Sequence, residues 1–110
     1  MIIADTGFVV SVTLTTDRFH QRCLALYRLQ PRIIMPASVL VETAYTLSGK
    51  AGSKATARFL QGLAATTRYQ IVDLTPDDIQ RAAQLLEKYA DTHVDFVDAS
   101  VAAIAERLKS

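Results

Sequence analysis

Three short apolar runs, separated by helical patterns, constrain the fold of this chain more than any other feature of its sequence. The first run covers residues 1–4, the second Ile33 to Met35, and the third Ile71 and Val72. Short apolar runs that end at turn or cap residues are typical of buried strands. A parallel strand returns to its sheet through a crossover, so strands that alternate with helices indicate a parallel sheet with helices on both faces. The sequence therefore predicts one three-layer α/β/α sandwich domain over residues 1–110.

Helical patterns fill most of the remaining chain. They cover residues 17–29, 37–48, 53–66, 77–89 and 96–109. Residues 74–78, Leu-Thr-Pro-Asp-Asp, are typical of a helix start, with an N-cap, a proline and acids in the first turn. We interpret residues 49–53 as a turn between two helices, and residues 5–7 as a turn behind the first strand.

Composition excludes several classes of protein. The formal net charge of +1 provides no overall attraction to nucleic acid or to an anionic membrane. The N-terminus lacks the basic and long apolar regions of a signal peptide, and no stretch approaches the roughly 18 apolar residues of a membrane helix. The single cysteine, Cys23, forms no internal disulfide framework. We therefore expect a cytoplasmic protein that has no association with membranes.

Acidic residues occur in three segments that this fold predicts at one edge of the sheet. Asp5 directly follows the first strand, Glu42 lies about two turns into the helix after the second strand, and Asp95 and Asp98 open the last helix. Two carboxylates about 4 Å apart repel by roughly 4 kcal/mol at an effective dielectric of 20, so such a cluster needs protons or a cation. Oxygen ligands without histidine or cysteine favour Mg²⁺ or Mn²⁺ over Zn²⁺.

Each acid taken singly also has an ordinary structural explanation. Asp95, with Asp98 three residues later, fits a helix cap. Glu42 fits a solvated helix position, and residues 5–7 fit an ordinary turn. Only the convergence of these acids at one edge favours a cation site.

Three segments carry a resemblance to a known family. They are IIADTGFVVSV at residues 2–12, PASVLVETAYTL at 36–47 and VDFVDASVAAIAERL at 94–108. In order and spacing the sequence resembles the PIN-domain ribonucleases, and among them the VapC-type toxins of bacterial toxin–antitoxin pairs.

The resemblance implies a Mg²⁺- or Mn²⁺-dependent endoribonuclease, the toxin of a type II toxin–antitoxin pair, which hydrolyses RNA phosphodiesters with metal-activated water. In the family's pattern Asp5, Glu42 and Asp98 are metal ligands and catalytic acids. Asp95 is a further acid, ranked below Asp98, and Thr6 is a polar neighbour of the site. The implied partners are RNA, a small antitoxin protein and a second copy of the chain in a homodimer.

One departure from the family's pattern keeps an alternative open. Such proteins continue after the last helix into a strand with a further aspartate in a Thr-x-Asp pattern, whereas this sequence reaches Ser110 first. We therefore expect a C-terminally shortened PIN-like fold. The alternative is a catalytically weak or inactive PIN-like module that engages an antitoxin or another protein. An acyl-phosphate enzyme with Asp5 as nucleophile is a third hypothesis, disfavoured because Gly7 stands where a second aspartate is expected.

Basic residues form two groups that are relevant to RNA. Arg18 and Arg22 belong to the first long helical pattern, and Lys54 and Arg58 follow at a spacing of four. Phosphate contact and a solvated helix face both explain them. We predict these four as RNA-binding residues.

Overall fold

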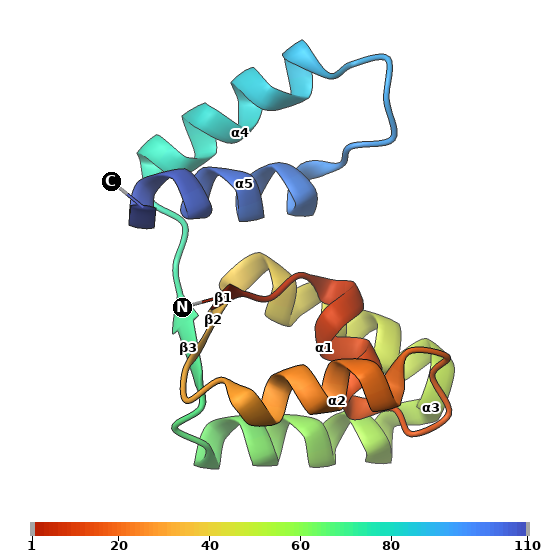
Figure 1. Cartoon of the computed structure of the whole chain (residues 1–110). Helices are drawn as coiled ribbons and strands as arrows, with labels where there is room; N and C mark the ends of the chain where they lie inside the picture. Colours follow the sequence, from red (N-terminus) through yellow and green to blue (C-terminus); the bar gives the residue numbers. More distant parts are fainter. Residues whose placement is uncertain (1, 110) are drawn as a thin grey trace.

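A computed structural model describes residues 2–109 of the chain. Strands and helices alternate in it, as predicted (Figure 1). In chain order the elements are β1 (Ile2–Ile3), α1 (Thr6–Thr13), α2 (His20–Leu29), β2 (Ile33–Pro36), α3 (Ala37–Ala65), β3 (Tyr69–Val72), α4 (Pro76–Lys88) and α5 (Phe96–Lys109). Met1 and Ser110, which the predicted domain includes, lie outside the described residues.

The three strands form one parallel sheet in the order β1-β2-β3. Ile33 of β2 pairs with Ile2 on one side and with Tyr69 on the other. All four residues of β2 are buried. Because successive side chains of a strand point to opposite faces, both faces of the sheet are covered. The predicted α/β architecture with a central parallel sheet is confirmed.

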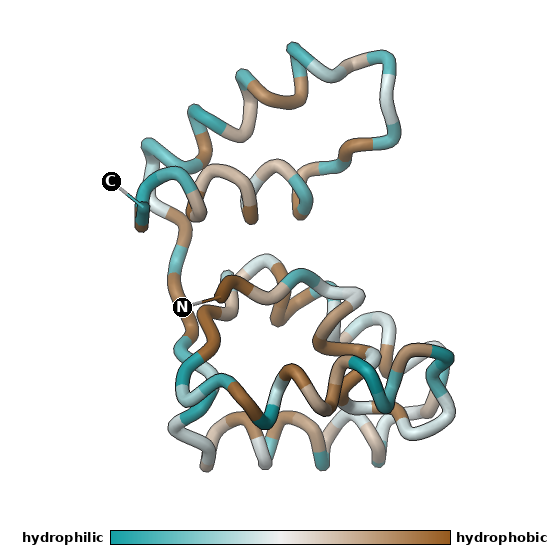
Figure 2. The backbone as a smooth tube through the Cα atoms, in the orientation of Figure 1, coloured by the Kyte–Doolittle hydropathy of each residue, from teal (hydrophilic) through white to brown (hydrophobic). Residues whose placement is uncertain are grey.

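The helices divide into two groups (Figure 1). Helices α1, α2 and α3 lie together, and α4 and α5 form a separate hairpin. Apolar residues gather where β1 and β2 meet α1 (Figure 2). The main buried cluster consists of Ala4, Val9, Ile33, Met35 and Val39. None of the helices within residues 2–109 has the length and the apolarity that crossing a bilayer requires.

The carboxyl ends of the strands lead into the helix N-termini that are relevant to function. Asp5 is the N-cap of α1, directly after β1, and α3 begins one residue after Pro36. Thr75 is the N-cap of α4 and forms a capping box with Asp78, as the Leu-Thr-Pro-Asp-Asp pattern indicates. The carboxyl ends of the parallel strands therefore open onto the N-termini of α1, α3 and α4.

Two predicted boundaries are wrong, and the predicted turn between two helices at residues 49–53 is confirmed. Residues 5–7 are not a turn but the start of α1, whose apolar residues 8–10 and 12 run almost continuously and so show no helical period in the sequence. Helix α2 begins at His20 rather than at residue 17, because the Asp17 carboxylate accepts hydrogen bonds from Phe19 N and Ser11 Oγ. The predicted turn lies at Gly52 (φ 86°, ψ 176°), whose backbone is not helical and separates the two helical arms of α3 (Figure 1).

Candidate functional site

Asp5 lies at the carboxyl end of β1, where the predicted topology places it. Its side chain is exposed, and Oδ1 accepts a hydrogen bond of 2.8 Å from Phe8 N. This bond explains why a helix starts here, since an N-cap carboxylate satisfies a backbone donor of the first turn. Within the described residues Oδ2 accepts no hydrogen bond, so Asp5 keeps one oxygen for a ligand. The Oγ1 atom of the neighbouring Thr6 is buried and has no hydrogen-bond partner among residues 2–109.

Asp95 and Asp98 cap α5 reciprocally. Asp98 N donates to Asp95 Oδ1 at 2.9 Å, and Asp95 N donates to Asp98 Oδ2 at 3.2 Å. The capping interpretation of this pair is therefore confirmed. Both side chains are exposed, and each retains one oxygen that makes no hydrogen bond to residues 2–109. Capping consequently leaves both residues able to bind a ligand through a single oxygen.

Glu42 lines an open groove of about 560 Å³ between α3 and the start of α5. Its side chain is half-buried, and the other lining residues are mainly apolar: Ala37, Ser38, Val41, Tyr45, Leu74, Phe96 and Val97. Val41 and Tyr45 are 70% and 83% exposed, which is unusual for apolar side chains that share one helix face. The groove therefore combines one carboxylate with an apolar wall.

The predicted acids do not assemble into a closed cluster. Across residues 2–109, no three side chains among His, Cys, Asp and Glu are grouped so that they could hold a metal ion. Asp5 and Asp98 do not line the groove that contains Glu42. The donor set still fits a hydrated Mg²⁺ or Mn²⁺, because Mg²⁺ is commonly held by one or two carboxylates together with waters and substrate phosphates.

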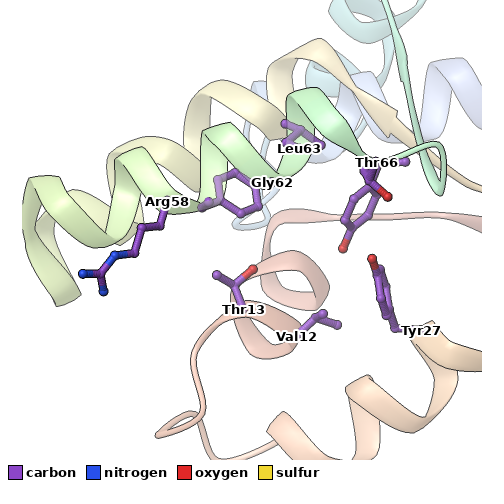
Figure 3. A pocket seen from close by; sticks show the side chains of 9 residues that line it. Val12, Thr13, Tyr27, Arg58, Gly62, Leu63 and Thr66 are labelled. Carbon is purple, nitrogen blue, oxygen red and sulfur yellow. The ribbon is translucent and has the colours of Figure 1, made fainter.

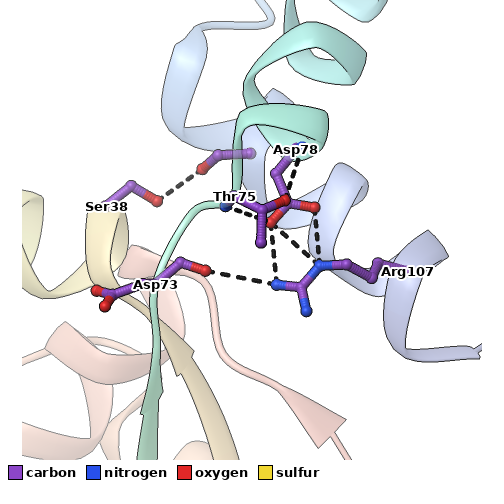
Figure 4. Close-up of polar contacts among 6 residues, drawn as sticks. Ser38, Asp73, Thr75, Asp78 and Arg107 are labelled. Carbon is purple, nitrogen blue, oxygen red and sulfur yellow. Dashed lines mark hydrogen bonds and ion pairs between the residues drawn. The ribbon is translucent and has the colours of Figure 1, made fainter.

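A hydrogen bond between two serines connects the helices that carry Glu42 and Asp98. Ser38 Oγ of α3 lies 2.6 Å from Ser100 Oγ of α5 (Figure 4). Ser100 is fully buried, whereas Ser38 is half-buried and reaches the groove. Neither serine was predicted to have a role, because a contact between residues 62 positions apart has no local signal in the sequence.

The predicted RNA-binding side chains are all exposed. Arg18 stacks over the ring of Phe19, with its guanidinium carbon 5.1 Å from the ring centroid. Arg22, Lys54 and Arg58 lie on exposed positions of α2 and α3. Exposure leaves these cations available to phosphate, and their role in RNA binding stays a prediction.

A second cavity, of about 260 Å³, lies between α1, α2, α3 and β3 (Figure 3). Tyr27 and Arg58 are among its lining residues, and the guanidinium of Arg58 extends away from Tyr27. Tyr69, also in the lining, has a buried hydroxyl without a hydrogen-bond partner among residues 2–109. Burial raises the pKa of the Tyr69 phenol well above its ordinary value, so the hydroxyl stays protonated. Because Tyr69 begins β3, this cavity lies at the opposite end of the strands from Asp5.

Comparison with protein families decides the identity of the fold. The model of the PIN domain matches residues 2–110. The chain belongs to the PIN-domain family. The predicted family is thus confirmed, and the three segments on which the prediction rested all lie within the matched range of this PIN domain.

A solved structure shares the fold over nearly the whole PIN domain. The crystal structure of Mycobacterium tuberculosis VapC20, described as a toxin that cleaves the sarcin-ricin loop, superposes with a TM-score of 0.90 at 23% sequence identity. The match covers 99% of this chain and 84% of VapC20. Comparison with curated proteins finds no match.

One buried acid of this PIN domain was not predicted as part of any cluster. Asp78, only 3% exposed, accepts two-point hydrogen bonds from the guanidinium of Arg107, with the shortest N–O distance at 2.9 Å (Figure 4). Arg107 Nη2 also donates to Asp73 O at 3.4 Å. These bonds from Arg107, followed by those from Thr75, hold the pKa of Asp78 below its ordinary value. Since every Asp78 oxygen is engaged, we assign the residue a structural role, locking α5 onto the start of α4.

Proposed function

We propose that this PIN domain is a metal-dependent endoribonuclease, the toxin of a type II toxin–antitoxin pair. The observation that carries the proposal is the fold: PIN-family membership over residues 2–110, with VapC20, a sarcin-ricin-loop-cleaving toxin by its description, as a structural neighbour. The positions of the acids support it. Asp5 follows β1, and Glu42 and Asp98 occupy the two helices that the serine bond connects.

We assign Asp5, Glu42 and Asp98, with Asp95 as a further acid, as the residues that hold a hydrated Mg²⁺ or Mn²⁺, one or two of them directly and the others through its waters, and Thr6 as a polar neighbour. When bound, a divalent cation supplies a water of lowered pKa and neutralises charge on the phosphodiester. The chain's part is to hold the acids at the edge of a rigid sheet. Because each capping aspartate already has one oxygen fixed by a backbone N–H, its free oxygen is held in place before any ligand arrives.

The distribution of charge supports RNA as the substrate. Residues 2–72 contain eight Lys and Arg against three Asp and Glu, whereas residues 73–109 contain four against eight. A local excess of cations attracts the phosphate backbone even when net charge is small. We therefore place the RNA strand across the side of the molecule that carries Arg18, Arg22, Lys54 and Arg58.

The groove beside Glu42 is the surface to which we assign protein partners. The exposed Val41 and Tyr45 give the groove beside Glu42 an apolar wall that water contacts unfavourably. An antitoxin segment and a second copy of the chain, both expected from the family, are partners of the kind that such a wall accommodates.

The test is RNA cleavage in Mn²⁺ by Asp5→Asn and Asp98→Asn. Asparagine retains an oxygen that accepts the capping hydrogen bond, from Phe8 N at position 5 and from Asp95 N at position 98, but loses the charge, so the fold is retained. We expect cleavage to fall on the order of 100-fold or more, since each 1.36 kcal/mol of lost stabilisation is a factor of ten. Asp77→Asn is the matched control, because Asp77 is also an exposed acid in the first turn of a helix. Undiminished cleavage by both variants would sink the proposal.

A second candidate is a catalytically silent PIN-like binding module. The observation that favours it is the absence of a three-residue acidic cluster from the described residues. Calorimetric titration of Mn²⁺ into the wild-type protein separates the candidates, since a silent module gives no heat of binding and the nuclease does.

A further inference from the structure

The hydrogen bond between Ser38 and Ser100 belongs to a short chain of polar atoms. Ser100 Oγ lies 2.6 Å from Ser38 Oγ and 2.7 Å from Val97 O within α5. A serine hydroxyl has one proton and two lone pairs, so both bonds form together when Ser38 donates to Ser100 and Ser100 donates to Val97 O.

The two serines lie close in sequence to Glu42 and Asp98. Ser38 comes four residues before Glu42 on α3, which is about one helical turn, and both line the same groove. Ser100 comes two residues after Asp98 on α5. Ser100 is 0% exposed, so water does not compete for the bond.

We propose that Ser38 and Ser100 are positioning residues that set the separation of Glu42 and Asp98. The inference rests on the proposed function, because it concerns the acids of that site. A pair of hydroxyls can fix this separation because their hydrogen bond is short and directional, whereas apolar contacts are non-directional. Neither serine touches the substrate or the cation in this scheme.

The test compares Ser38→Ala, Ser100→Ala and the double variant with wild type. Loss of a partner that is hydrogen-bonded to a metal ligand commonly weakens metal affinity about 10- to 100-fold. Ser38 and Ser100 act on the acids only through the helices, so we expect the calorimetric dissociation constant for Mn²⁺ to rise at the low end of that range, about tenfold, in each single variant. Both variants break the same bond, so the double variant is expected to bind no more weakly than Ser100→Ala. We expect kcat for RNA cleavage to fall while KM changes little, because the basic side that binds RNA is unaffected.

The matched control is Ser48→Ala. Ser48 Oγ pairs with Thr56 Oγ1 at 3.2 Å, so the same kind of bond is lost from α3 at a distance from both acids. Ser38→Thr retains a hydroxyl at the half-buried position and is expected to restore Mn²⁺ affinity. Far-ultraviolet circular dichroism and thermal unfolding verify that each variant folds; Ser38→Ala keeps the test valid if the buried Ser100→Ala does not.

The outcomes distinguish two failures. Wild-type protein that neither binds Mn²⁺ nor cleaves RNA would overturn the proposed function and the positioning role with it. An active wild type whose Ser38→Ala variant equals Ser48→Ala in Mn²⁺ affinity and kcat would overturn the positioning role alone.

Discussion

The α4–α5 hairpin and the rest of the chain are held together by different forces. Residues 2–72 pack large apolar side chains around β2, with Ile33 and Met35 fully buried. The hairpin core is built mainly of Ala82, Ala99 and Leu85, and the ion pairs Arg107–Asp78 and Arg81–Glu106 join its helices. Small side chains bury little apolar area, so directional polar contacts contribute more of the hairpin's specificity. The two regions should therefore respond differently to cavities, acid and charge removal.

The largest effect is expected from a cavity in the first region. Met35→Ala removes a fully buried side chain from the central strand and should lower the free energy of unfolding by about 3 kcal/mol. Leu85→Ala, the matched change in the hairpin, should cost about 2 kcal/mol, because Leu85 is at the rim of a smaller cluster. Urea unfolding measures both. Equal losses would contradict the contrast between the two cores.

Removal of the buried acid Asp78 tests the contribution of polar contacts to the stability of the hairpin. Asp78→Ala deletes the acceptor of Arg107 and the capping box of α4, and should lower stability by about 2 kcal/mol at pH 7. The pKa of Asp78 is lowered in the folded state, and the unfolded value is about 3.9. Its contribution is therefore complete above about pH 4 and is lost as pH falls through the folded pKa. Urea titrations from pH 7 to pH 2 should show wild type and variant converging in acid. A constant difference would contradict a stabilising role for the ionised carboxylate.

A smaller effect is expected at Gly52. Its φ of 86° lies where side chains with a Cβ are strained, so Gly52→Ala should destabilise by about 1 kcal/mol. Gly49→Ala is the control: Gly49 is helical with no neighbouring atom within 4 Å of an added Cβ, and should stabilise by about 0.5 kcal/mol. Opposite shifts in thermal midpoint would establish that the break in α3, and not glycine content, matters.

The smallest effect is expected from the exposed ion pair. Arg81 and Glu106 have side chains 40% and 51% exposed, and solvent screens such pairs. Arg81→Ala should leave the thermal midpoint within the error of measurement, whereas Arg107→Ala, which leaves the buried Asp78 without its cation, should lower it clearly. A large shift for Arg81→Ala would show that the whole polar face of the hairpin acts as a network.

Local signals in the sequence predicted the parts of the fold that are determined locally. The start of α4 at Thr75 and Pro76 follows from short-range capping chemistry, and so does the Asp95–Asp98 box. The strand at residues 33–36 follows from an apolar run before a proline. Helix α1 was missed because its apolar residues form a short, nearly continuous run and it has no charged face to reveal a helical period.

Contacts between residues far apart in the sequence could not be predicted. Arg107 and Asp78 are 29 residues apart, and Ser38 and Ser100 are 62 apart, so no spacing rule connects them. The positions of Asp5 and Asp98 at element starts followed from the predicted topology, whereas the absence of a three-acid cluster from residues 2–109 depends on side-chain placement that topology does not determine. A resemblance to a family supplied the proposed role of these acids, which the residues alone left open.

The capping bonds of the aspartates also bear on ion selectivity. In the proposed site, Asp5, Asp95 and Asp98 each have one oxygen that accepts from a backbone N–H, which favours coordination of an ion through the other oxygen over bidentate coordination. Ca²⁺ takes six to eight oxygens and often uses carboxylates in a bidentate manner, whereas Mg²⁺ keeps an octahedral shell that retains several waters. A set of single-oxygen donors should therefore favour Mg²⁺ over the larger Ca²⁺, because it supplies too few oxygens for the coordination number that Ca²⁺ takes.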